Sequence, residues 1–173
     1  MLALVLTSRP GLAAGRECLA RLHPSRIGLV FGTLVSVSAS PSTISFQASD
    51  PDLGTVSGSS PGSVTWMVLS GSHLQNWTLT VQAAASAFAG CPTVPVAAVQ
   101  VACGSATVSG GGGTGACSGS FPLSTTPRQI AGGAEGDGTS SYSVTINFTL
   151  AESWQYIANS SCTLTLTYSV SAP

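Results

Sequence analysis

Two short acidic motifs are the residues of this chain whose spacing is best suited to binding a metal ion. Asp50 and Asp52 lie on either side of a proline, and Glu135 and Asp137 lie on either side of a glycine. Carboxylate oxygens on turns are ligands that Ca²⁺ prefers. Asp, Pro and Gly are also common in ordinary turns. The sequence therefore leaves a calcium site at these four acids as one interpretation and plain turns as the other, and it indicates no other cofactor.

A serine motif matches the nucleophile turn of serine hydrolases in its letters only. Residues 58–62 read G-S-S-P-G, which fits the pattern G-x-S-x-G. In hydrolases this turn leads into a helix, and the backbone N–H after the serine stabilises the oxyanion. Here Pro61 follows the serine and has no N–H, and the next residues alternate as a strand does. His73 is the one histidine after residue 23. We therefore expect a turn at this place and no enzymatic activity.

The cysteines indicate an oxidising compartment. Cys18 lies in the N-terminal segment, and the other four form an even set that consists of Cys91, Cys103, Cys117 and Cys162. An even set is typical of disulfide-bonded secreted proteins, and a zinc site is disfavoured because there is no C-x-x-C pair. Three pairings are open. We favour Cys91–Cys103, which closes a loop that holds Pro92 and Pro95, and this leaves Cys117–Cys162 to join two distant strands.

Alternation of apolar and polar residues is the strongest structural pattern. It extends over 142–150 and 162–170, and over the shorter runs 64–68 and 77–81. Period-two alternation places one set of side chains in a core and the other in water. With glycine- and proline-rich breaks between the runs, it predicts an all-β fold: an antiparallel β-sandwich of about seven or more strands, immunoglobulin-like or Greek-key. Four large side chains on the apolar phase are expected in the core: Trp66, Trp77, Phe148 and Leu166.

The charge of the chain limits its partners. Charged residues make up 6% of the sequence, against roughly 25% in ordinary soluble domains, and there is no lysine. From residue 33 onward five acids accompany one basic residue, Arg128, which gives a net charge of −4. Nucleic acids and anionic membranes are bound through several basic side chains. Both are therefore excluded as partners, and close packing with like chains is favoured instead.

The N-terminus has the features of an export signal. Four arginines precede residue 27, and an apolar run follows over 27–37. This run is too short for a membrane span, which needs about 20 residues, but it fits the apolar part of a signal peptide. We therefore predict a lead-in over 1–39, a single domain over 40–173, and no membrane span in the mature chain. The alternative is that residues 34–39 already form the first strand.

The tripeptide Trp77-Thr78-Leu79, inside an alternating strand, resembles the WxL domain of bacterial cell-surface proteins. The resemblance covers roughly residues 40–173 and implies association with the cell wall. The family has a second W-x-L near its C-terminus. This chain has Leu164-Thr165-Leu166 at the matching place, so the second tryptophan is missing.

Two functions fit these patterns. The first is a secreted or cell-surface β-sandwich with a structural or adhesive role, which binds the cell wall or other surface proteins. The second is self-association as a subunit of an extracellular filament, pilus or coat, in which a neighbour adds a strand to the sheet through backbone hydrogen bonds. Both place the mature protein outside the cell.

Overall fold

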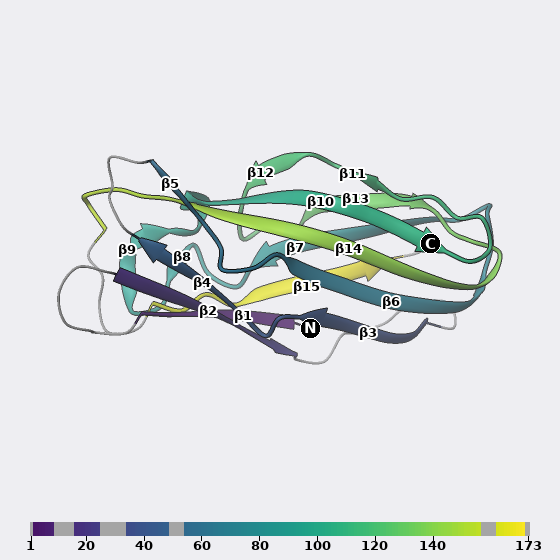
Figure 1. Cartoon of the computed structure of the whole chain (residues 1–173), viewed down its shortest axis with the longest axis horizontal. Helices are drawn as coiled ribbons and strands as arrows, with labels where there is room; N and C mark the ends of the chain where they lie inside the picture. Colours follow the sequence, from purple (N-terminus) through teal and green to yellow (C-terminus); the bar gives the residue numbers. More distant parts are fainter. Residues whose placement is uncertain (1, 9–15, 25–33, 49–53, 157–161, 172–173) are drawn as a thin grey trace.

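The computed structural model describes the chain over residues 2–8, 16–24, 34–48, 54–156 and 162–171, with side chains over 37–46, 54–156 and 162–171. Within these ranges it is almost entirely β-strand, and the strand pairs are antiparallel (Figure 1). One 3-10 turn interrupts the strands at Val96–Ala98. The predicted all-β, antiparallel fold is confirmed.

The larger sheet is called the β14 sheet here, after its longest strand. Its strands follow the order β12-β10-β14-β6-β3, and β5 pairs with one end of β14. Its members are β12 (Ser120–Pro122), β10 (Val99–Ser109), β14 (Gly138–Ala151), β6 (Gly62–Gly71), β3 (Leu34–Ser40) and β5 (Thr55–Ser57).

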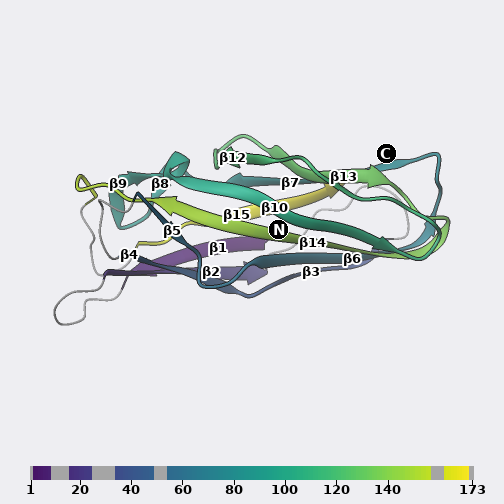
Figure 2. The same cartoon turned by 45° about the horizontal axis from the view of Figure 1, so that its top comes forward.

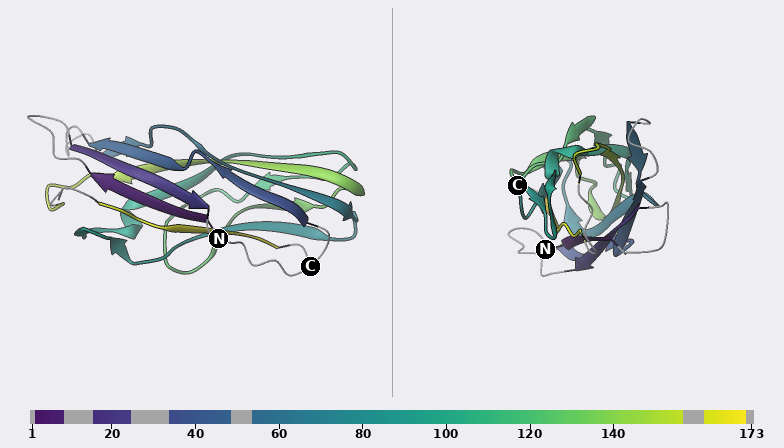
Figure 3. Two further views of the ribbon diagram at one scale, coloured as in Figure 1. Left: turned by 90° about the horizontal axis from the view of Figure 1, so that it is seen from below. Right: turned by 90° about the vertical axis from the view of Figure 1, so that its left-hand side faces the viewer.

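The second sheet, called the β7 sheet, follows the order β11-β13-β7-β15. Figure 2 shows β7 and β13 in one layer and β14 and β6 in the other. An end-on view shows the strands arranged around a central core (Figure 3). The members of the β7 sheet are β11 (Ala116–Cys117), β13 (Arg128–Ala134), β7 (Asn76–Ala83) and β15 (Leu166–Ser171).

The remaining strands form two smaller sheets. A hairpin of β8 (Ala87–Phe88) and β9 (Cys91–Pro95) leads into the 3-10 turn and β10. The N-terminal sheet has the order β1-β2-β4, with β1 (Leu2–Ser8), β2 (Arg16–Pro24) and β4 (Thr43–Ala48).

The alternation in the sequence becomes the two faces of each strand. On β14 the apolar residues from Tyr142 to Leu150 are buried, while the residues between them are exposed or half-buried. The C-terminal run behaves differently, because β15 begins only at Leu166 and not at Cys162. Thr163 instead forms an isolated bridge with Ala89 of the β8–β9 hairpin. This bridge lies beside the disulfide bond that joins Cys162 to Cys91 of the same hairpin.

Aromatic rings fill the space between the two main sheets. Trp66 of the β14 sheet meets Trp77 of the β7 sheet edge to face, with ring centroids 5.2 Å apart. Tyr142 stacks on Trp66 at 5.1 Å. Such pairs add about 0.5–1.5 kcal/mol each beyond the area they bury. The predicted burial of Trp66, Trp77, Phe148 and Leu166 is confirmed, since each is at most 3% exposed.

The cysteines form two disulfides, but the favoured pairing is wrong. The bonds are Cys91–Cys162 and Cys103–Cys117. The two cysteines separate because the chain after Cys91 passes through the 3-10 turn and enters β10, which takes Cys103 into the β14 sheet. There it lies against Cys117 of β11, so this bond links the β14 sheet to the β7 sheet.

The predicted lead-in contains strands. β1, β2 and β3 all lie before residue 41, and β3 pairs with β6 up to Ser40, opposite Ser63. Much of the predicted apolar run lies at residues 27–33, outside the described residues. The boundary between residues 39 and 40 stays a prediction. In the described part of the chain no helix is long and apolar enough to cross a membrane.

Candidate functional site

Three loops meet at one end of the molecule, at the right in Figure 1. They are the turns after β6, β10 and β13. Asp137 fastens them together: one carboxylate oxygen accepts the backbone N–H of His73 at 3.0 Å, the other lies 3.3 Å from the His73 Nε2, and the Asp137 N–H donates to Gly111. Glu135 is buried and accepts the N–H of Ser72 at 3.3 Å. Both acids therefore hold loops in place.

These contacts bear on the predicted calcium ligands. Glu135 and Asp137 belong to one loop, and each accepts a backbone N–H of the neighbouring turn. Asp50 and Asp52 lie outside the described residues. Among the residues that are described, no group of three or more His, Cys, Asp or Glu side chains is placed to hold a metal ion. A calcium site at these four acids stays a prediction.

The serine motif at 58–62 is a turn, as predicted. Ser59 donates its N–H to the carbonyl of Ser45 at 2.8 Å, and its hydroxyl accepts the N–H of Ser45 at 3.0 Å. The next element is strand β6, which begins at Gly62. The Ser59 side chain therefore ties β4 to the turn that precedes β6. Ser60, which has the nucleophile position in the motif, lies in the same turn, directly before Pro61.

The Trp77-Thr78-Leu79 motif is divided between the two faces of β7. Trp77 and Leu79 are buried in the core, and the Trp77 indole N–H donates to the carbonyl of Thr114 at 2.9 Å. Thr78 is on the outer face, where its hydroxyl lies 2.6 Å from that of Ser171. The tryptophan thus packs the core and anchors the loop after β10.

The outer face of the β14 sheet carries aligned side chains that could contact a ligand. Strand register places Thr65, Ser143 and Thr107 in one row across three strands. The next row is formed by Met67, Ser141 and Ser109. Neighbouring strands lie about 4.8 Å apart, and residues two apart on a strand are about 6.8 Å apart. These six residues therefore form a small grid of five hydroxyls and one thioether.

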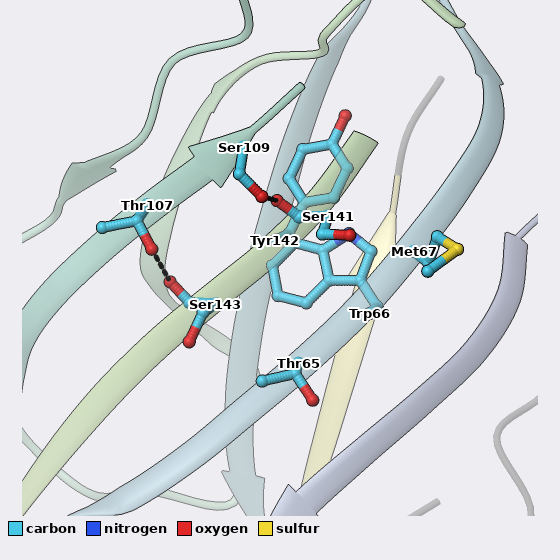
Figure 4. Close-up of a pocket in the computed structure, with 8 residues that line it drawn as sticks. All are labelled: Thr65, Trp66, Met67, Thr107, Ser109, Ser141, Tyr142 and Ser143. Carbon is cyan, nitrogen blue, oxygen red and sulfur yellow. Dashed lines mark hydrogen bonds between the residues drawn. The ribbon is translucent and has the colours of Figure 1, made fainter. Parts of the chain in front are cut away.

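The grid surrounds a hollow of about 290 Å³ (Figure 4), which is called the hydroxyl hollow here. Trp66 and Tyr142, which lie between the grid positions on their strands, also line it. Ligand pockets typically measure about 300–1,000 Å³, so the volume of this hollow lies just below that range. Its grid residues are Thr65, Met67, Thr107, Ser109, Ser141 and Ser143.

Hydrogen bonds within the hydroxyl hollow use some of its hydroxyls and leave others available. Thr107 and Ser109 each donate to a backbone carbonyl of β14, at 3.3 Å and 3.4 Å, as Figure 4 shows. Thr65 shares a hydrogen bond of 2.7 Å with Ser38 of β3. Within the described chain, the hydroxyls of Ser141 and Ser143 make no hydrogen bond. Thr107 and Ser109 can thus still accept hydrogen bonds through their lone pairs, while Ser141 and Ser143 can both donate and accept.

Charged groups lie outside the hydroxyl hollow. Among residues with described side chains, Arg128 packs its guanidinium 4.6 Å from the ring centroid of Phe121, and His73 pairs with Asp137 in the end loops. Among the described residues that line the hollow, none is charged. The sequence shows Ser and Thr at alternate positions of three segments, but this pattern alone does not predict the site. The missing information was which strands are neighbours.

No protein-family model matches the chain, and no curated protein or solved structure does.

Proposed function

We propose that this protein is a secreted or cell-surface β-sandwich with a structural or adhesive role, associated with the cell wall and without catalytic activity. The observation that carries the proposal is the uncharged, hydroxyl-covered outer face of the β14 sheet. A rigid sheet that presents aligned neutral hydroxyls is suited to contact with an extended neutral surface. It is poorly suited to nucleic acid or anionic lipid, which basic groups bind.

The disulfides support an extracellular location. Two bonds in a chain of 173 residues are typical of proteins that fold outside the reducing cytosol. Cys91–Cys162 is buried among apolar residues. Such a bond is formed during folding in an oxidising compartment and is then protected from reductants.

The groups with catalytic potential support a structural role. Glu135 and Asp137, the acids of the loop after β13, bind the backbone of the turn after β6. Each of these side chains fastens one element to another. They therefore contribute to the scaffold on which a binding surface is displayed.

A filament or coat subunit that assembles by strand addition is the second candidate. It is favoured by β3, which ends the β14 sheet and contains no charged residue. Sheet edges are normally protected from pairing with other chains by charged residues, above all lysine. This chain contains no lysine. In this candidate the β3 edge would pair with a strand of the next copy.

Cell fractionation with thiol labelling tests the location. Cells that produce the full chain are separated into cytoplasm, membrane, wall and medium, and free thiols are alkylated before denaturation. We expect the protein in the wall or medium, with Cys91, Cys103, Cys117 and Cys162 unlabelled. Protein confined to the cytoplasm, with two or more of these thiols labelled, contradicts the proposal.

A further inference from the structure

We propose that the hydroxyl hollow on the outer face of the β14 sheet binds a neutral polysaccharide chain. This inference rests on the adhesive role proposed above and names the chemistry of the partner and the residues that contact it. The contact residues are the grid of Thr65, Met67, Thr107, Ser109, Ser141 and Ser143.

The hydrogen-bonding capacity of the hollow points to a hydroxyl-rich ligand. The protons of Thr107 and Ser109 are directed at carbonyls of β14, so these oxygens face outward as acceptors. Ser141 and Ser143 can donate as well as accept. A ligand that complements both kinds of group must itself supply donors and acceptors close together, which is what sugar hydroxyls do.

The absence of charge from the lining points to a neutral ligand. A phosphate or carboxylate ligand would require a cation or a set of backbone N–H groups, and a cationic ligand would require an acid. In the part of the chain that the structure describes, the hydroxyl hollow is lined by neither kind of charged side chain. Hydroxyl-to-hydroxyl contacts carry no such requirement, so a neutral chain suits the site best.

Met67 supplies the apolar part of the site. It is half-buried within the grid, opposite Ser141 on the neighbouring strand. Its flexible, polarisable side chain can pack against the C–H groups of a sugar ring. The small volume of about 290 Å³ suits a short stretch of a longer chain, with further sugar units lying over the rest of the Ser- and Thr-rich face.

Methyl NMR on the full chain provides a direct test, because the sequence contains only two methionines, Met1 and Met67. Methionine methyl groups are labelled, and soluble β-glucan, mannan or galactan is added. We expect at least one polymer to shift the Met67 signal in a saturable way and to leave the Met1 signal in place. The substitution Met67→Leu assigns the two signals.

Two matched double variants show where binding takes place. Ser141→Ala with Ser143→Ala removes the available hydroxyls, and the loss of two hydrogen bonds should weaken binding about tenfold. Thr78→Ala with Ser171→Ala removes a hydroxyl pair from the outer face of the other sheet and should leave binding unchanged. Affinity electrophoresis in gels that contain the polymer measures both, and thermal unfolding confirms that both variants fold.

Three results overturn the proposal: no polymer shifts Met67, the two double variants lose affinity equally, or the Met67 signal changes with protein concentration alone. The last result would mean that a second copy covers the hollow. A protein that is oxidised and located in the wall, yet shows no shift, would leave the surface role intact and refute only the glycan site.

Discussion

The two faces of the β14 sheet are made by the same strands and have opposite chemistry. On β6, Trp66 is buried against Trp77 and Tyr142, while its neighbours Thr65 and Met67 line a solvent-facing hollow. On β14, Tyr142 packs inward and Ser141 and Ser143 point outward. The inner face supplies the free energy of folding. The outer face, which is not needed for packing, is where a binding function can be carried without loss of stability.

The largest expected effect comes from removing a core ring. Trp77→Ala should lower the free energy of unfolding by about 3–5 kcal/mol, because it leaves a cavity beside Trp66 and Tyr142. Thr78→Ala, one residue along the same strand but on the outer face, should change it by less than about 0.5 kcal/mol. Urea unfolding measures both values. Equal losses would mean that the two faces do not differ as the structure indicates.

The two disulfides allow a similar comparison between a buried bond and a partly exposed one. Cys91–Cys162 closes a separation of 71 residues and Cys103–Cys117 one of 14. A disulfide limits the conformations of the unfolded chain, and more so for a longer loop. Replacing each pair by alanine should therefore lower the free energy of unfolding by about 4 kcal/mol for Cys91–Cys162 and by about 3 kcal/mol for Cys103–Cys117. Urea unfolding ranks them. The Cys103–Cys117 bond, with Cys117 exposed, should also be reduced first by a mild thiol reductant, and reduction in the opposite order would contradict this.

Alkaline pH should weaken the inner face. Burial raises the pKa of Tyr168, on β15. The native state therefore keeps a proton that the unfolded chain releases above its ordinary pKa of about 10, so stability is unaffected below that pH and falls by up to about 1.4 kcal/mol per pH unit above it. Unfolding measured from pH 8 to 11 in the wild type and in Tyr168→Phe provides the comparison. Identical pH profiles would show that Tyr168 does not contribute.

A small effect is also expected at the exposed end loops. Asp137→Asn removes the contact between the Asp137 carboxylate and the His73 imidazole, whose side chains are 65% and 44% exposed, respectively. Exposed pairs contribute about 0–1 kcal/mol because water and salt screen them. Chemical unfolding at low and high ionic strength measures the difference. A loss above about 2 kcal/mol would show that this loop contact is as important as a core contact.

The strands and the core could be predicted from the sequence because alternation is a local property. In residues 142–150, apolar residues that are buried alternate with polar residues that face outward. Trp66 and Trp77 lie at apolar positions of shorter alternating runs. The disulfide partners and the hydroxyl hollow could not be predicted, because both depend on which distant strands become neighbours. Cys103 pairs with Cys117 only because β10 lies against β11, and Ser143 joins Thr65 and Thr107 only because β14 lies between β6 and β10.

Co-sedimentation with isolated cell walls tests the surface role most directly. The oxidised, purified protein is centrifuged with and without walls, at low and at high ionic strength. We expect it to pellet with walls to the same extent in both buffers, because few charges are available for salt to screen, and to stay in solution without walls. Pelleting without walls would favour the filament. Protein that stays in the supernatant under all four conditions would contradict both the adhesive and the filament role.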